Sequence, residues 1–192
     1  MSSASLKIRL RDLLAKLSLR RGRVVLASGK ESDFYLDCKQ TTLNAEGASV
    51  VGELVFEHIR RLRADGLAVE GVGGMTLGAD PIAVATAVTS HKRGEPLHAF
   101  IIRKEPKSHG TRAYLEGAKN LGEGARVLLV EDVVTTGGST LRALERARES
   151  GLEPVAILTL VDRQEGGREN LEATGLPFAA LLTRADFDEV EA

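Results

Sequence analysis

At 192 residues, with 43% hydrophobic and 28% charged residues, the chain is expected to form one globular domain with a substantial core. The net charge of −1 gives no argument for a nucleic-acid partner, so a local basic cluster has to meet any anionic ligand. The single cysteine, Cys38, excludes an intrachain disulfide and fits a reducing cytoplasm, and no apolar run is long enough to span a membrane.

The N-terminal segment predicts a helix followed by a small hairpin. Leucines between Leu6 and Leu17 recur at helical spacing, which indicates an amphipathic helix. Two short strands are expected at Val24–Leu26 and Phe34–Leu36, on either side of a polar turn that contains Lys30. The hairpin is too small to be a separate domain. We expect residues 20–40 to form a hood over a site.

Helices and strands alternate along the rest of the chain. Expected helices cover residues 49–63, 81–90 and the segment from 140 to about 150. Apolar runs predict strands at residues 68–72, 97–102, 127–130, 155–161 and 178–182. This alternation indicates an α/β fold with a mainly parallel central sheet flanked by helices. Residues 104–121 are polar, show no clear periodicity and predict a long loop.

The stretch from Val127 to Thr140 carries the clearest chemistry. Glu131 and Asp132 follow an apolar run typical of a strand buried on both faces, at the point where that strand is expected to end. A glycine-rich turn and a helix follow, and free amides at a helix N-terminus bind anions. The two carboxylates suit a sugar diol or a hydrated Mg²⁺ ion instead. The stretch therefore predicts a ligand that joins a phosphate to a ribose diol.

This stretch resembles the phosphoribosyl pyrophosphate (PRPP) signature of type I phosphoribosyltransferases: an apolar strand, two acids, two apolar residues, then Thr-x-Gly-x-Ser/Thr. Five further stretches are similar to orotate phosphoribosyltransferases in order and spacing: Ser28-Gly29-Lys30, Phe34-Tyr35 with Asp37, Gly78–Ala83, Arg103–Gly110 and Asp162–Glu165. The resemblance implies a type I phosphoribosyltransferase fold with residues 1–192 as one domain. It also implies Mg²⁺-dependent phosphoribosyl transfer from PRPP to orotate, which gives orotidine 5′-phosphate and pyrophosphate in pyrimidine biosynthesis.

The same resemblance implies roles for individual residues. The expected PRPP-binding residues are Arg103, Lys104, Lys107, His109, Glu131, Asp132, Val133, Val134, Thr135, Thr136, Gly137, Gly138 and Ser139. Lys107, His109 and Asp132 are the expected catalytic residues, and residues 104–121 the mobile catalytic loop. The expected orotate-binding residues are Thr135, Arg163, Lys30, Phe34 and Tyr35. Mg²⁺ is expected to arrive with PRPP and to meet Glu131 and Asp132 only through water, with no direct protein ligand.

Two positions depart from the family pattern, and several points stay open. Lysines that some relatives carry are replaced here by Ala27 and Leu77. The resemblance implies that the turn Gly73–Leu77 lies on the pyrophosphate side and contains a cis peptide bond. It also implies a homodimer in which the loop of one subunit enters the site of the other. Two alternatives are a phosphoribosyltransferase for another base, in which Arg163 would lose its purpose, and a non-catalytic regulator that senses PRPP and binds RNA.

Overall fold

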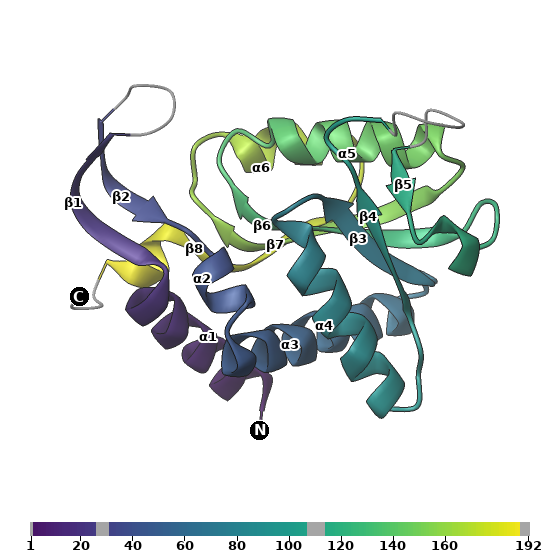
Figure 1. The fold of residues 1–192 in the computed structure, drawn as a ribbon, viewed down its shortest axis with the longest axis horizontal. Coiled ribbons are helices and arrows are strands. Elements are labelled where there is room, and N and C mark those ends of the chain that lie inside the picture. The colour runs from purple at the N-terminus through teal and green to yellow at the C-terminus, as the bar shows by residue number, and fades with distance from the viewer. Residues whose placement is uncertain (1, 26–30, 107–113, 189–192) are drawn as a thin grey trace.

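The computed structural model describes residues 2–25, 31–106 and 114–188 (Figure 1). Within these ranges one sheet has six strands, in the order β5 (Leu115–Glu116), β4 (His98–Ile102), β3 (Gly71–Met75), β6 (Arg126–Val134), β7 (Glu153–Asp162) and β8 (Phe178–Thr183). Neighbouring strands run parallel, except that β5 is antiparallel to β4. The prediction of a mainly parallel central sheet is confirmed.

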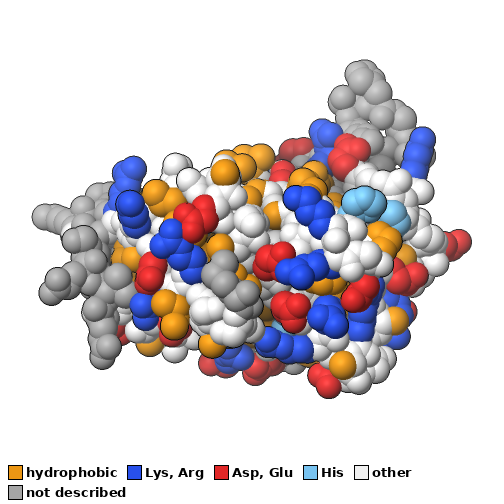
Figure 2. Space-filling view, turned by 90° about the horizontal axis from the view of Figure 1, so that it is seen from below, with side chains coloured by type: hydrophobic (Ala, Val, Ile, Leu, Met, Phe, Trp, Pro, Cys, Tyr) orange, Lys and Arg blue, Asp and Glu red, His pale blue; other side chains and the backbone are white. Residues whose placement is uncertain are grey.

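Helices cover both faces of this sheet (Figure 1). One layer contains α1 (Ser3–Leu17), α3 (Ala45–Ala64) and α4 (Ala79–Lys92), and the other contains α5 (Gly138–Glu149) and α6 (Gly167–Glu172). Ion pairs join the first layer, with N–O distances of 2.6 Å for Arg9–Glu46 and 2.7 Å for Arg93–Glu53. Figure 2 shows basic and acidic side chains intermixed on the face seen from below. No helix within the described ranges is long and apolar enough to cross a membrane.

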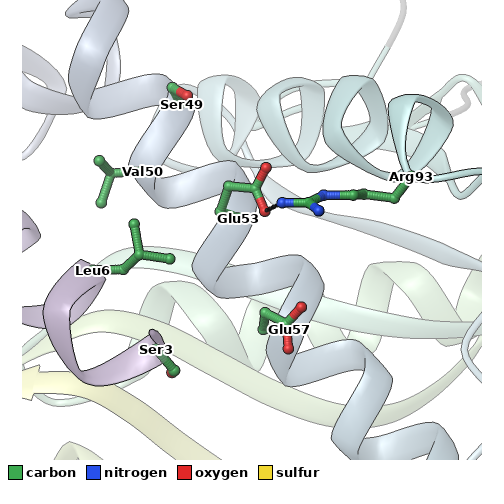
Figure 3. Close-up of a pocket in the computed structure, with 7 residues that line it drawn as sticks. All are labelled: Ser3, Leu6, Ser49, Val50, Glu53, Glu57 and Arg93. Atoms are coloured by element: carbon green, nitrogen blue, oxygen red, sulfur yellow. Dashed lines mark hydrogen bonds and ion pairs between the residues drawn. The ribbon is translucent and has the colours of Figure 1, made fainter. Parts of the chain in front are cut away.

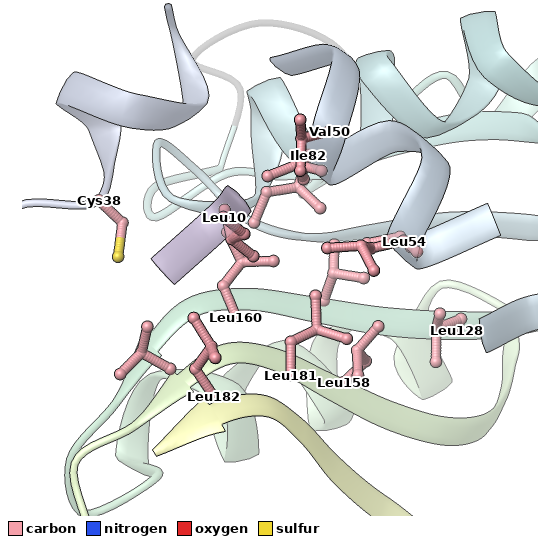
Figure 4. Packing of buried hydrophobic residues seen from close by; sticks show 14 of the residues in the cluster. Leu10, Cys38, Val50, Leu54, Ile82, Leu128, Leu158, Leu160, Leu181 and Leu182 are labelled. Atoms are coloured by element: carbon pink, nitrogen blue, oxygen red, sulfur yellow. The ribbon is translucent and has the colours of Figure 1, made fainter. Parts of the chain in front are cut away.

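Strand β6 is buried on both faces, as its apolar run predicts. Leu128 belongs to the core cluster beneath α1 and α3, where Leu158 also lies (Figure 4). Val127 and Leu129 belong to the cluster on the opposite face, which includes Ala143 of α5. Because alternate residues are anchored in two cores, the carboxyl end of β6 is held in one fixed position.

Strand β3 covers Gly71–Met75, so it begins and ends three residues later than the strand expected at residues 68–72. Gly73 and Gly74, which were expected to follow the strand, lie inside it. A Cβ atom at Gly73 would lie 2.1 Å from the carbonyl oxygen of Phe100, and one at Gly74 would lie 2.2 Å from that of Val130. The neighbouring strands therefore approach so closely that only glycine fits. Residues without side chains carry no apolar pattern, which explains the misplaced prediction.

The N-terminal hairpin pairs β1 (Leu19–Val25) with β2 (Glu31–Leu36) in antiparallel register. Its strands are longer than predicted, and helix α1 ends at Leu17, since Leu19 already pairs with Leu36. The ring of Phe34 packs edge-on against Phe187, with centroids 6.1 Å apart, and this contact ties the hairpin to the main body. Short elements were not predicted: α2 (Lys39–Thr42), α6, β5, and the 3₁₀ turns η1 (Ala118–Asn120) and η2 (Arg184–Phe187).

Candidate active site

The carboxyl ends of β3, β4, β6 and β7 meet at one rim of the sheet, where ligands bind in open α/β folds. A pocket of about 230 Å³ opens there. Its lining residues are Lys39, Met75, Thr76, Leu77, Gly78, Lys104, Glu131, Asp132 and Ser139. The rim therefore brings segments that are far apart in the sequence, including the predicted acidic pair, to one cavity.

Glu131 and Asp132 lie within β6 rather than beyond its end, because Val133 and Val134 continue the ladder to β7. Glu131 is only 6% exposed, and the hydroxyl of Thr140 donates to its Oε2 at 3.4 Å. Burial raises the pKa of Glu131 to about 8, and the adjacent charge of Asp132 adds to this effect. Asp132 is only partly buried and faces the pocket. The pair thus combines a carboxyl group that holds a proton with a more accessible carboxylate.

Gly78 lies directly against both carboxylates. A Cβ atom at this position would lie 2.5 Å from Asp132 Oδ1 and 2.9 Å from Glu131 Oε1. The preceding Thr76–Leu77 peptide bond is cis, as the resemblance implied for this turn. The hydroxyl of Thr76 donates to Asp80 at 2.7 Å, which connects the turn to the start of α4. The turn after β3 therefore closes one wall of the pocket on the acidic pair.

The N-terminus of α5 forms another part of the rim. Gly137 has φ of 81°, a left-handed conformation that favours glycine, and α5 begins at the next residue. Among the described residues, no side chain caps this helix, and its first turn carries no acid. Asn170 of α6 donates to the carbonyl of Thr136 at 2.9 Å and holds the loop in place. Open amides and the helix dipole make this end suitable for a phosphate group.

Arg163 follows β7 and lies at the same rim. Its guanidinium contacts Glu165 at 2.8 Å and donates to the backbone carbonyl of Phe34 at 3.4 Å. Its backbone N–H donates to the carbonyl of Val134, so Arg163 also connects the end of β6 to the hairpin. The buried Nε finds no hydrogen-bond partner within residues 2–25, 31–106 and 114–188. Arg163 thus has donor capacity left for an anionic ligand.

A larger hollow of about 440 Å³ lies between α1, α3 and α4, away from the strand ends (Figure 3). Its lining residues are Ser3, Leu6, Ser49, Val50, Glu53, Glu57 and Arg93. Arg93 pairs with Glu53, and Arg60 pairs with Glu57, so both acids of this hollow already have a basic partner. The pocket at the rim is smaller, but it alone of these two contains the acidic pair and a helix-start hydroxyl, Ser139.

The chain was compared with known proteins. Residues 80–174 match the family model described as "Phosphoribosyl transferase domain". The orotate phosphoribosyltransferase of Sorangium cellulosum (strain So ce56) is 49% identical over 186 residues, which cover 97% of this chain and 95% of that protein. The chain belongs to the orotate phosphoribosyltransferase family. A relative of the same name from Rhodopseudomonas palustris (strain TIE-1) is 44% identical and covers 97% of this chain.

Solved structures of this family share the fold. The Mycobacterium tuberculosis H37Rv orotate phosphoribosyltransferase in complex with Fe(III) dicitrate superimposes with a TM-score of 0.80 and is 40% identical over 95% of this chain and 99% of that one. The same enzyme in complex with PRPP superimposes with a TM-score of 0.76 and is 38% identical over 94% of this chain. The predicted type I phosphoribosyltransferase fold is therefore confirmed.

Within this family framework, the structure gathers part of the predicted PRPP-binding set. Lys104, Glu131, Asp132 and Ser139 line the pocket. Arg103 instead pairs with Glu116 of β5, with 3.1 Å between nitrogen and oxygen. The predicted residues Lys107 and His109 lie outside the described ranges, as does Lys30 of the orotate set.

Three of the predicted site residues, Val134, Phe34 and Tyr35, are buried or half-buried. Val134 is buried in the core beneath α5, so only its main chain can face a ligand. Phe34 is 5% exposed, and its ring lies beneath the guanidinium groups of Arg163 and Arg184, at 5.6 and 5.3 Å from the centroid. Tyr35, its neighbour on β2, is half-buried. Phe34 therefore supports Arg163 in this structure.

Lys39 lines the pocket, although no role was predicted for it. The signal in the sequence was the pair Asp37 and Lys39 directly after the expected strand Phe34–Leu36. Asp37 belongs to the stretch that resembles the family, but charged residues at a strand end are common on loops, so Lys39 was not predicted without the fold. Thr76 and Thr140 were also missed, since their importance depends on hydrogen bonds to Asp80 and Glu131.

Proposed function

We propose that this chain transfers the 5-phosphoribosyl group from PRPP to orotate and releases pyrophosphate. The observation that supports this proposal is the juxtaposition at the end of β6. Glu131 and Asp132 line a pocket directly beside the uncapped start of α5, where Ser139 also lies. This arrangement matches a ribose diol joined to a 5′-phosphate, and the family is that of enzymes named for orotate.

The binding arrangement follows from the strand order. The ribose hydroxyls of PRPP bind the carboxylates of Glu131 and Asp132. The 5′-phosphate binds the amides and hydroxyls of the loop from Thr135 to Ser139. Because β6 delivers both groups and is anchored in two cores, the ribose is held in one orientation.

The reaction breaks the bond between ribose C1 and the diphosphate oxygen and forms a bond from C1 to N1 of orotate, and the N1–H proton is lost to the departing diphosphate. Positive charge develops on the ribose ring, and the fixed carboxylate of Asp132 stabilises it. The departing diphosphate carries several negative charges, which Lys104 meets from the end of β4. We include Lys107 and His109 in this role as part of the proposal.

We also propose that Mg²⁺ takes part, carried by PRPP. Carboxylate oxygens such as those of Glu131 and Asp132 are hard ligands that suit this ion. The described residues hold no group of three or more His, Cys, Asp or Glu side chains that could hold a metal by themselves. PRPP and water would therefore supply most of the ligands, and the two carboxylates would contact the ion through water. When bound, Mg²⁺ neutralises charge on the diphosphate.

Orotate is placed on the β7 side of the rim. Its carboxylate binds the guanidinium of Arg163, which is suited to recognise a planar anion with two oxygens. Thr135 lies on the loop beside it, and the hairpin with Phe34 and Tyr35 covers the base. We include Lys30 in this proposal as a further orotate-binding residue.

We propose that the active unit is a homodimer in which the part of residues 104–121 that precedes β5 and includes Lys107 acts on the partner's site. The prediction of one uninterrupted loop over residues 104–121 is wrong, because β5 pairs with β4 and η1 follows it. An apolar groove of about 460 Å³ between α2, α3 and α4 supports this proposal. Leu43, Val84 and Val88 line it and are 73%, 51% and 50% exposed. Helix α4 begins beside Gly78 of the active-site pocket, so a second copy on this surface would lie next to the site.

A cytoplasmic location is also proposed. The one cysteine, Cys38, is a buried free thiol, as expected for a reducing compartment. PRPP is highly charged and does not cross membranes unaided, so the enzyme has to work where PRPP is made. Fluorescent tagging of the full chain in its source cells would test this location.

The activity is tested with a panel of bases supplied with PRPP and Mg²⁺, following pyrophosphate release. Orotate is expected to give the highest rate by a wide margin. A higher rate with uracil, adenine or guanine would assign the chain to another base. Release with none of the bases, despite PRPP binding, would favour a sensor of PRPP over an enzyme.

A further inference from the structure

Lys39 is held rigidly at the rim of the active-site pocket. It opens the short helix α2, and its neighbours Cys38, Thr41 and Thr42 are buried in the body of the protein. The hydroxyl of Thr41 lies 2.7 Å from that of Ser18, which ties α2 to the end of α1. The backbone of Lys39 is therefore fixed, while its side chain stays partly exposed and lines the pocket.

Asp37 orients the Lys39 ammonium. Its Oδ1 lies 2.7 Å from Lys39 Nζ and also accepts the backbone N–H of Lys39 at 3.3 Å. Its Oδ2 accepts from the side-chain amide of Gln40 at 3.2 Å. The hydrogen bond to Asp37 raises the pKa of Lys39, and the charge of Asp132 adds to this, so the ammonium stays protonated. The Lys39 side chain also lines the pocket that it shares with Asp132.

The strand order identifies which part of a PRPP-like ligand lies nearest to Lys39. Lys104 follows β4, and the turn Thr76–Gly78 follows β3, so both lie on the side of the acidic pair away from Arg163. Lys39 shares its pocket with these two segments. An anion between Lys39 and Lys104 is therefore the group attached at ribose C1 on the side opposite the base, which is the diphosphate.

We propose that Lys39 binds the diphosphate of PRPP and the pyrophosphate product, with Asp37 as its positioning residue. The identity of the ligand rests on the proposed function. The neighbouring wall supports this assignment, because Leu77 lines the same pocket with an apolar side chain that is 67% exposed. Lys39 of α2 thus supplies a cation on this side of the pocket in addition to Lys104, and the turn after β3 contributes backbone and an apolar side chain.

Calorimetric titration of the full chain with Mg²⁺-pyrophosphate and with orotidine 5′-phosphate tests this proposal. Orotidine 5′-phosphate has the ribose and the 5′-phosphate but no diphosphate. Lys39→Ala should weaken pyrophosphate binding about tenfold or more, the loss expected for one charge-assisted hydrogen bond. Binding of orotidine 5′-phosphate should stay within about twofold of the wild type, a change no larger than that expected from an exposed charge. Lys39→Arg, which keeps the charge, should recover most of the pyrophosphate affinity.

Lys16→Ala, an exposed position on α1, serves as the matched control and should leave both affinities unchanged. Unchanged pyrophosphate binding in Lys39→Ala would overturn the proposal. Equal weakening of both ligands would also overturn it, because it would show a general role in shaping the pocket. The result is separable from the proposed activity: a Lys39-dependent pyrophosphate site in a chain that fails to use orotate would support this inference and remove the base assignment.

Discussion

The guanidinium of Arg163 pairs with the carboxylate of Glu165 at 2.8 Å. The Arg163 side chain is 10% exposed, whereas that of Glu165 is 39% exposed. In the proposed function, the carboxylate of orotate would therefore meet a buried arginine already paired with a more exposed acid. Glu165 would then compete with orotate for the guanidinium of Arg163.

Replacing Arg163 and replacing Glu165 should change the KM for orotate in opposite directions. Arg163→Ala should raise the KM for orotate sharply, because loss of one partner of a buried ion pair costs about 2–5 kcal/mol. Glu165→Gln should lower that KM about twofold to fivefold, the range expected for a partly exposed ion pair. Steady-state kinetics at saturating PRPP measures both. A raised KM in Glu165→Gln would show instead that Glu165 holds Arg163 in place for orotate.

The raised pKa of Glu131 predicts proton release on ligand binding. With a pKa of about 8, the buried carboxyl is protonated at neutral pH, whereas ribose hydroxyls and a hydrated cation favour the ionised form. Binding of Mg²⁺-PRPP should therefore expel a proton, and affinity should rise with pH up to about 8. Calorimetry at pH of about 7 in buffers of different ionisation enthalpy measures this release. Binding heats that are independent of the buffer would contradict the prediction.

The same carboxyl should affect stability with a defined sign. The pKa of Glu131 in the folded protein lies above the ordinary value of 4.5, so the unfolded chain loses this proton first as the pH rises. The contribution of Glu131 to the free energy of unfolding is therefore fully present below about pH 4.5. It falls between about pH 4.5 and pH 8, by up to about 1.4 kcal/mol per pH unit. Glu131→Gln has no such proton to lose, so its free energy of unfolding, measured in urea, should rise relative to that of the wild type between about pH 4.5 and pH 8. Glu149→Gln, at an exposed position on α5, is the control and should show no gain.

Gly78 offers a test of how closely the turn after β3 packs on the acids. Gly78→Ala would place a Cβ within 2.5 Å of Asp132 Oδ1, so both carboxylates have to move. We expect a loss of PRPP use of about a hundredfold, as expected for a displacement of about 1 Å at a site of this kind. Gly122→Ala is the matched control, because nothing lies within 4 Å of a Cβ there. Equal activity of the two variants would contradict the packing of the turn.

The shared active site of the proposed dimer is tested by mixing two inactive variants. Lys107→Ala carries its lesion on the loop before β5, within residues 104–121, and Arg163→Ala carries its lesion at the rim. If the loop acts on the partner's site, a heterodimer has one site with both lesions and one that is intact, so up to half of the sites of each heterodimer recover. Activity after reassociation of the mixed subunits is the measurement. Demonstrated subunit exchange without recovery would place the loop on its own subunit's site.

Much of the fold could be predicted from the sequence, because apolar runs such as residues 127–130 are buried on both faces of a parallel sheet. The candidate site at the end of β6 could be predicted because its acids and glycines are contiguous in the sequence. Strand β3 was misplaced, because its glycines are required by close backbone contacts with Phe100 and Val130 and leave no periodic signal.

The residues that were missed depend on distant neighbours. Lys39 reaches the pocket only because α2 packs next to the rim, and its partner Asp37 is two residues away in the sequence. The burial of Glu131, and hence its raised pKa, depends on α5 and on the continuation of β6. No local pattern encodes such contacts, so the sequence alone predicted only that both acids lie at the end of a strand.

The most direct test of the central claim measures both products of the reaction in the same sample. With orotate, PRPP and Mg²⁺, the wild type should form orotidine 5′-phosphate and pyrophosphate in equal amounts. Asp132→Asn should keep its circular dichroism spectrum and lose most of both products. Pyrophosphate formed without orotidine 5′-phosphate would identify the chain as a PRPP hydrolase, and formation of neither product by the folded wild type would contradict the account.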